Sequence, residues 1–262
     1  MGAMKENMSR KRSKDNLEKI AEDADIELTE TDFGVSATLQ SLSDLQPLLS
    51  ELNEDKANLN AMVDLGCGYG AVSKILAEYL SIPSICGIDR DEERLDHART
   101  RGITTYNINL EETPLPFSDG EIDLVTSFGV LEHLRYYDNP ISESYRVLRE
   151  RGWILFSVPN LGSWTSRLSL LFGYQPRDVE ISSQRAFGIS GFYDKVYDRA
   201  PLVHIHSVTL NAFKELLEFY GFHIVSVVGF APYQTSATVK FVDKLFSVKP
   251  SWSRRFAVLA RK

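Results

Sequence analysis

The chain of 262 residues is 43% hydrophobic, which is enough to bury the core of one full domain. Its formal net charge is -7, although the first 14 residues hold five basic side chains and one acidic, so the remaining body is acidic and nucleic acid is not expected as a partner. The two cysteines have neither disulfide nor metal-ligand spacing, so we expect a reducing compartment and no bound metal. No apolar run reaches the roughly 18–20 residues that span a bilayer, and no secretory signal is present, so we expect a cytoplasmic protein.

Residues 1–30 are charged and poor in aromatic side chains, which predicts a solvated N-terminal tail, with a nucleic-acid or membrane arm as the alternative. We expect residues 31–262 to form a single domain. Leucines recur at helical spacing between residues 38 and 52, interrupted by Pro47, and they predict a helix that leans on the ligand site.

A glycine-rich turn follows the first predicted strand, in the sequence Met-Val-Asp-Leu-Gly-Cys-Gly-Tyr-Gly at residues 62–70. Glycines in such a turn let a ligand approach the bare backbone. Dinucleotide enzymes use the spacing G-x-G-x-x-G and place a pyrophosphate at the helix N-terminus, whereas here Gly66, Gly68 and Gly70 alternate behind Asp64. Asp64 would repel a pyrophosphate and attract an ammonium or sulfonium group, which favours S-adenosylmethionine. Cys67 stands between two of these glycines, and a nucleophilic role would need a paired base. The sequence offers no such base, so we interpret Cys67 as a small residue of the turn.

The next two predicted strands supply further polar groups at their ends. The apolar run 83–88 ends in Asp89, roughly 20 residues beyond the glycines, where a carboxylate can accept hydrogen bonds from both ribose hydroxyls. Arg90 is expected either to lie along the adenine or to stay exposed at the strand end. A third strand at 104–108 leads into Asn109 and Leu110.

A fourth strand, 122–127, runs into Phe128 and then Val-Leu-Glu-His-Leu at 130–134. In the order and spacing of its motifs over residues 60–160, the chain resembles the class I S-adenosylmethionine-dependent methyltransferases. More narrowly, it is similar to the small-molecule group that includes the quinone-biosynthesis methyltransferases. The motifs that carry this resemblance are Val63–Gly70, Ile88-Asp89, Leu115-Pro116-Phe117, Asp123-Leu124-Val125, Val130–Leu134, and Arg146-Val147-Leu148 leading to Gly152.

The resemblance implies a role for three further residues. The group commonly places Asp at position 109, where it accepts a hydrogen bond from the adenine amine; Asn109 keeps one acceptor oxygen but loses the charge. The backbone of Leu110 would serve the adenine ring nitrogen, and Phe128 would line the pocket beside the adenosine.

Strands and helices alternate from residue 61 onward, with helices predicted at 71–79, 91–101 and 137–149 and a fifth strand at 153–158. This alternation predicts a Rossmann-like, doubly wound α/β sheet that is mainly parallel, with helices on both faces. The C-terminal part continues with a helix at 209–220, a strand at 223–229, a helix near 239–246 and a strand at 255–260. The resemblance implies that the last of seven strands is antiparallel.

Residues 160–206 interrupt the alternation and are too long for an ordinary connection, so we interpret them as a lid over the acceptor site. A stripe of aromatic and leucine residues lies inside this insertion, at 164–174. It is typical of side chains that form the core of a lid; the alternatives are the wall of an apolar acceptor site and a contact with a membrane surface. Tyr193 and Tyr197 are possible acceptor contacts.

Two histidines are the candidate catalytic residues. His133 follows the fourth strand and is the first candidate for a general base, with a structural histidine as the alternative; Glu132 is expected to fix a loop or cap a helix. His204 and His206 point the same way if their segment is extended, and His206 is the second candidate.

The sequence as a whole therefore predicts methyl transfer from S-adenosylmethionine to an oxygen, nitrogen or carbon atom of a lipid-like or sugar-like small molecule by in-line displacement. Two alternatives are a non-catalytic S-adenosylmethionine-binding subunit and, disfavoured by the glycine spacing and Asp64, an NAD-dependent oxidoreductase.

Overall fold

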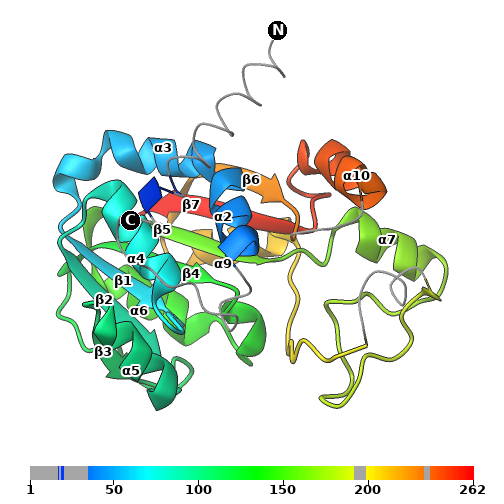
Figure 1. Ribbon diagram of the computed structural model, residues 1–262, viewed down its shortest axis with the longest axis horizontal. Helices are drawn as coiled ribbons and strands as arrows, with labels where there is room; N and C mark the ends of the chain where they lie inside the picture. The colour runs from blue at the N-terminus through cyan, green and yellow to red at the C-terminus, as the bar shows by residue number, and fades with distance from the viewer. Residues whose placement is uncertain (1–16, 18, 21–34, 192–198, 233–236) are drawn as a thin grey trace, which may run out of the picture.

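The computed structural model describes residues 17, 19–20, 35–191, 199–232 and 237–262 (Figure 1). The predicted tail at 1–30 lies almost wholly outside this part of the chain, as do Tyr193 and Tyr197, so those expectations stay predictions. Among the described residues, no helix has the length and apolar character needed to cross a bilayer.

The strands form one seven-stranded sheet in the order β3-β2-β1-β4-β5-β7-β6. Neighbouring strands from β3 to β5 pair in parallel, and β7 is antiparallel to both β5 and β6, which confirms the predicted fold class. The strands are β1 Ala61–Leu65, β2 Ser84–Asp89, β3 Thr104–Asn107, β4 Ile122–Phe128, β5 Leu148–Pro159, β6 His223–Phe230 and β7 Arg255–Arg261.

Helices cover both faces of this sheet (Figure 1). The helices are α2 Val35–Asp44, α3 Gln46–Glu54, α4 Ala71–Leu80, α5 Glu92–Thr100, α6 Asp138–Val147, α7 Trp164–Leu171, α9 Leu210–Phe219 and α10 Ala237–Ser247, with short 3-10 helices η1 Lys56–Asn58 and η2 Leu131–His133. The single helix predicted over 38–52 is two helices, because Pro47 stands in the first turn of α3, where its missing N–H costs nothing.

The sheet separates two buried apolar clusters, and successive strand residues alternate between them. In β1, Met62 joins the cluster beneath α2, α3 and α4, whereas Val63 joins the cluster beneath α6 and α9. In β4, Leu124 and Val125 divide in the same way. A strand buried on both faces favours apolar residues at successive positions, which explains the mainly apolar runs in the sequence.

The insertion at 160–206 begins directly after β5, at the carboxyl edge of the parallel strands. It contains α7, and its described residues beyond α7, 172–191 and 199–206, are tied to one another: Arg177 pairs with Glu180 at 2.7 Å, and Glu180 also accepts hydrogen bonds from the backbone of Leu202 and Val203. Ligands of open α/β sheets bind outside this edge, so the insertion stands where the predicted lid is needed.

Candidate active site

The loop between β1 and α4 is fixed to the neighbouring strand. The backbone N–H groups of Gly66 and Cys67 both donate to the carbonyl oxygen of Ile88, at 2.7 and 2.9 Å. Gly66, Gly68 and Gly70 have positive φ angles of 74°, 53° and 81°, which favour glycine. The alternating glycines are therefore needed to bend the chain back onto the end of β2.

The three glycines differ in what surrounds them. A Cβ on Gly66 would lie 2.2 Å from Val130 Cγ2, and one on Gly70 would lie 2.6 Å from Ile103 Cδ1. A Cβ on Gly68 would meet nothing within 4 Å. Gly66 and Gly70 thus serve packing, while Gly68 leaves an open face of the loop where a ligand can approach the backbone.

Asp89 stands at the end of β2 and faces this loop. Its Oδ2 accepts a hydrogen bond from Gly68 N at 3.0 Å, and its Oδ1 accepts from Arg90 N and Asp91 N at 2.8 and 3.1 Å. These bonds hold the carboxylate at the rim of the loop, in the place proposed for the ribose hydroxyls. The Arg90 side chain itself is exposed at the strand end.

Asp64 is buried beneath the loop and is only 3% exposed. Its two carboxylate oxygens accept hydrogen bonds from Ser73 Oγ at 2.5 Å and Thr126 Oγ1 at 2.6 Å. Burial raises the pKa of Asp64 to about 6, because desolvation disfavours the charged form. Burial likewise raises the pKa of the Cys67 thiol, beside the charges of Asp64 and Asp89, so Cys67 is not poised as a nucleophile.

The adenine side of the predicted cradle lies at the same edge. Ile108 N donates to the carbonyl of Asp89 at 3.0 Å, which places Asn109 next to the end of β2. Asn109 Oδ1 accepts a hydrogen bond from Glu111 N at 3.1 Å, so one of its two lone pairs already serves a local turn. Leu110 is 6% exposed and Phe128 is half-buried at the end of β4.

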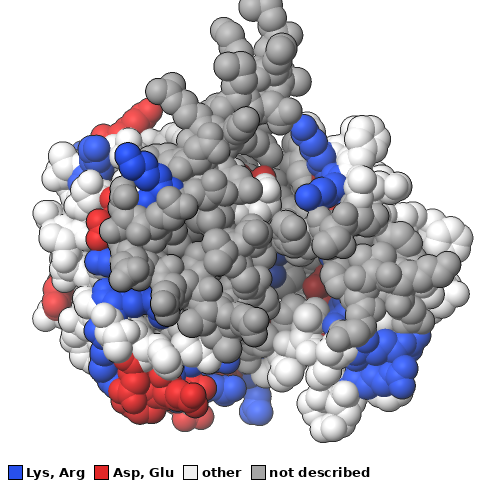
Figure 2. Space-filling view, in the orientation of Figure 1, with Lys and Arg blue, Asp and Glu red and all other residues white. Residues whose placement is uncertain are grey.

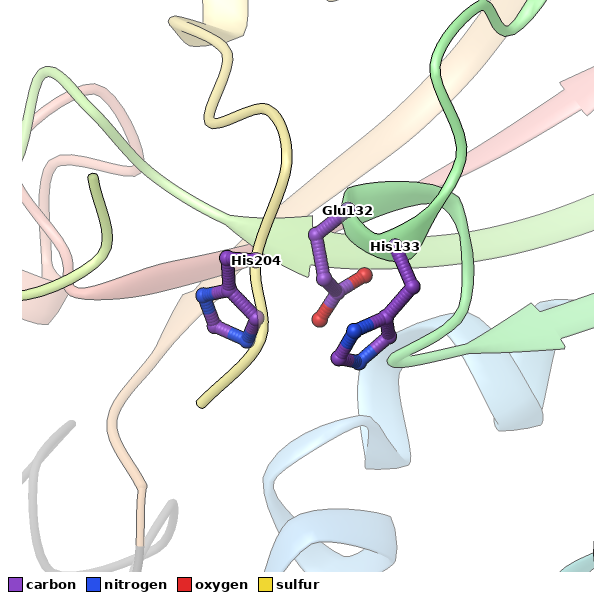
Figure 3. A group of neighbouring side chains, drawn as sticks. All are labelled: Glu132, His133 and His204. Carbon is purple, nitrogen blue, oxygen red and sulfur yellow. The ribbon is translucent and has the colours of Figure 1, made fainter. Parts of the chain in front are cut away.

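A second group of polar side chains follows β4. Glu132 and His133 lie in η2, and His204 reaches them from the insertion, with the Glu132 carboxylate between the two imidazole rings (Figure 3). The ring centroids of His133 and His204 are 5.1 Å apart. Glu132 is buried, and Arg255 Nη2 from β7 lies 3.2 Å from its Oε1. The backbone also ties the insertion to this point, because Ile205 N and His206 N both donate to the carbonyl of Glu132.

Several buried polar atoms of this group have no hydrogen-bond partner within the described residues: Glu132 Oε2, Tyr137 Oη and His204 Nδ1 are among them. Buried polar groups are normally satisfied, so an ordered water or a polar ligand would complete the hydrogen bonding of this cluster. His133 Nδ1 lies 3.0 Å from the carbonyl of Val203, which assigns the proton to Nδ1 and leaves a lone pair on Nε2. Burial lowers the pKa of His204 to about 4, so this ring is neutral near pH 7.

The same group offers three metal-ligating atoms, from Glu132, His133 and His204, within 4.8 Å of one another. Arg255 beside Glu132 already balances its negative charge and opposes a second cation. The expectation that the chain binds no metal stays a prediction.

Comparison with known proteins agrees with this architecture. Residues 63–156, which include the glycine loop, Asp89 and the strand that leads to His133, match the family described as a methyltransferase domain. The chain contains a class I S-adenosylmethionine-dependent methyltransferase domain.

Named relatives and solved structures point to the same class. A protein of Mycolicibacterium smegmatis named "Probable S-adenosylmethionine-dependent methyltransferase/" is 31% identical over 172 residues, covering 64% of this chain and 54% of the relative. A mitochondrial ubiquinone biosynthesis O-methyltransferase of Candida albicans is 28% identical over 155 residues, covering 54% of this chain and 46% of the relative. The match thus spans about half the length of these relatives. A crystal structure of an S-adenosylmethionine-dependent methyltransferase from Mesorhizobium loti shares the fold, with a TM-score of 0.57 and 23% identity over 84% of this chain and 98% of that one.

In the insertion after β5, the structure separates the two histidines that were expected to share one face if their segment is extended. The chain bends at Ile205, where the consecutive N–H groups of Ile205 and His206 donate to one carbonyl, so the stretch between the two histidines is not extended. His204 faces His133, whereas the exposed His206 lies with its ring centroid 6.5 Å from that of Tyr137. The assumed extended geometry was wrong, and the catalytic role of His206 stays a prediction.

Sequence reasoning missed three members of this group. The missed members are Tyr137, Arg255 and His204 in its contact with His133. They come from different elements, and no short motif joins them to His133. The one available signal was that Glu132 is charged yet stands in an apolar segment, which requires a buried cationic partner elsewhere in the chain.

Two glycine variants separate packing from ligand binding. Both Gly66→Ala and Gly68→Ala strain a left-handed backbone by about 1 kcal/mol, but only the Cβ of the first collides with Val130. We expect Gly66→Ala to lower the thermal midpoint markedly more than Gly68→Ala. Gly68→Ala is expected to bind S-adenosylhomocysteine at least about tenfold more weakly in calorimetry. Wild-type affinity in Gly68→Ala would show that the open face of the loop is not the binding face.

The raised pKa of Asp64 predicts a pH dependence. Since its carboxylate is charged only above about pH 6, affinity for the cationic methionine end should fall as the pH drops from 8 to 5. Calorimetry with S-adenosylhomocysteine measures this, and Asp64→Asn should show weaker binding that is nearly flat over the same range. An equal pH slope in the wild type and Asp64→Asn would assign the dependence to another group.

Proposed function

We propose that this chain transfers a methyl group from S-adenosylmethionine to a hydroxyl group of a small, lipid-like or sugar-like acceptor. The observation that carries the proposal is the pairing of two sites at one sheet edge. One is a glycine loop with an open face between Asp64 and Asp89, and the other is a buried polar group around His133 that lacks partners.

The residues of the loop fit the cofactor. Gly68 leaves room against the backbone, Asp89 presents carboxylate oxygens to ribose hydroxyls, and Asp64 places a buried negative charge beneath the methionine ammonium. When bound, S-adenosylmethionine supplies a methyl group on a sulfonium, which is already activated for transfer. The main task of the protein is therefore to hold the acceptor atom in line, at about 3 Å, and to exclude water.

His133 is the proposed general base. Its Nδ1 is occupied by the carbonyl of Val203, so Nε2 is the atom that can take a proton from an acceptor hydroxyl. The Glu132 Oε2 and Tyr137 Oη atoms, both without partners, are proposed to orient that hydroxyl. Because Arg255 balances the charge of Glu132, this carboxylate can stay buried beside the reacting group.

Oxygen is favoured as the acceptor atom because a base is needed only where the acceptor must lose a proton. The relative of Candida albicans is named as an O-methyltransferase, which supports the same choice. A non-catalytic S-adenosylmethionine-binding subunit is the alternative, and it would have no need for a base with a free lone pair.

Cofactor choice provides the first test. We expect S-adenosylhomocysteine to bind with a low-micromolar Kd, about -8 kcal/mol, and NAD to bind far more weakly, because alternate glycines behind a buried carboxylate disfavour a pyrophosphate. Isothermal titration calorimetry measures both ligands under one condition. Tighter binding of NAD would overturn the methyltransferase proposal.

Two histidine variants test the chemistry of the acceptor site. Transfer of a labelled methyl group to a panel of phenols and alcohols is expected to fall about 10²–10⁴-fold in His133→Ala, with little change in acceptor KM. If His206 only shapes the pocket, His206→Ala should mainly raise KM. Full turnover in both variants would leave positioning as the catalytic device and refute the general base. Binding of S-adenosylhomocysteine is the control for folding.

A further inference from the structure

Helix α7 has its side chains reversed with respect to an ordinary surface helix. Leu168, Leu170 and Leu171 are 45%, 60% and 74% exposed, whereas Thr165 and Ser169 on the same helix are buried. A surface helix normally buries its apolar residues and exposes its hydroxyls. The reversal indicates that the outer face of α7 meets an apolar medium.

Helix α10 presents a second apolar face. Phe241 and Leu245 are 71% and 63% exposed at i, i+4 spacing on one side of the helix, and Val248, the first residue after the helix, is 84% exposed. The opposite side, with Val239 and Asp243, is buried. Thus one side of α10 already packs against the rest of the protein, and the exposed aromatic and aliphatic side chains on its other side are not needed for that packing.

The two helices are joined into one surface at the right of Figure 1. Trp164 Nε1 of α7 donates to Asp243 Oδ1 of α10 at 2.9 Å, and the Trp164 ring stacks on Phe246 with centroids 5.5 Å apart. Between the helices lies an almost wholly apolar cavity of about 370 Å³. We name this region the α7–α10 surface; its outer residues are Leu168, Leu171, Phe172, Phe241, Leu245 and Val248.

Among the described residues, the exposed charged side chains around this surface are basic. Within residues 160–191, 199–206 and 237–254, the acidic side chains Asp178, Glu180 and Asp243 are buried or half-buried, and the exposed charged side chains are all basic. The exposed basic residues that carry this argument are Arg167, Arg185 and Lys249. The whole chain carries a net charge of -7, so this region is basic against an acidic body. Figure 2 shows a large acidic group at the lower left of the molecule and a basic group at the lower right, below α7 and α10, where Figure 1 draws the loops of the insertion.

We propose that the α7–α10 surface docks on the face of an anionic lipid bilayer. Exposed aromatic and leucine side chains enter the boundary between headgroups and acyl chains, and flanking basic side chains attract anionic headgroups. A second copy of this chain fits less well, because a two-fold interface would bring like basic charges together. The purpose of this docking rests on the proposed function. Because α7 and His204 belong to the same insertion, docking would place the lid of the acceptor site at a membrane that dissolves a lipid-like acceptor.

Vesicle sedimentation tests the docking with the full chain. The probes are vesicles of phosphatidylcholine alone and vesicles that also contain phosphatidylglycerol. We expect binding to the anionic vesicles to be about tenfold stronger than to the neutral ones and to weaken at high salt. Phe241→Ser should lower binding to anionic vesicles about fivefold or more.

Phe219→Ser is the matched control, because Phe219 is 79% exposed on α9, outside this surface, and its loss should leave vesicle binding unchanged. Both variants should bind S-adenosylhomocysteine like the wild type, which shows that they fold. Equal vesicle binding by Phe241→Ser and the wild type would overturn the proposal, as would the absence of binding to anionic vesicles.

A concentration-dependent dimer that Phe241→Ser abolishes, without vesicle binding, would instead assign the surface to a second copy. Failure of the proposed function is distinguishable, since cofactor binding is measured without lipid. A chain that binds vesicles but not S-adenosylhomocysteine would refute the methyltransferase proposal and leave the docking intact.

Discussion

The candidate site depends on the hydrogen bonds that hold the loop after β1 against the end of β2. The carbonyl of Ile88 accepts from both Gly66 and Cys67, and the carboxylate of Asp89 accepts from Gly68. Since β1 and β2 are adjacent and parallel, their carboxyl ends meet at one edge, and the loop cannot shift without losing these bonds. The open face at Gly68 is positioned by this clamp.

Glu132 fixes the chain in the same way on the proposed acceptor side of the site. Its carboxylate is paired with Arg255 of β7, and its backbone carbonyl receives two N–H groups of the insertion. A buried charge is costly unless it is paired, so the end of β4, the last strand and the insertion are held to one geometry by one residue. The insertion that supplies His204 also carries α7, and chemistry and proposed membrane contact therefore share one segment of chain.

Much of the fold was predictable from local pattern. Apolar runs bounded by turn residues located the strands, and the alternation of strands and helices indicated a doubly wound sheet, as the structure confirms. The predicted helix over 38–52 was wrong in its continuity, because the leucine spacing continues through the break at Leu45, just before Pro47 in the first turn of α3. The fifth strand also begins earlier than predicted, at Leu148, because it pairs with Ile122 across a register shift.

The sequence by itself determined the glycine loop, the acids at Asp64 and Asp89 and the position of His133, since each follows directly from the end of a strand and needs only local backbone geometry. Only the tertiary structure decided that His204 meets His133, that Arg255 pairs with Glu132, and that α7 and α10 expose apolar faces. These contacts join residues far apart in the chain, and the bend at Ile205 removes the alternation expected of an extended segment. Local patterns set which elements form; long-range packing sets which side chains meet and which remain exposed.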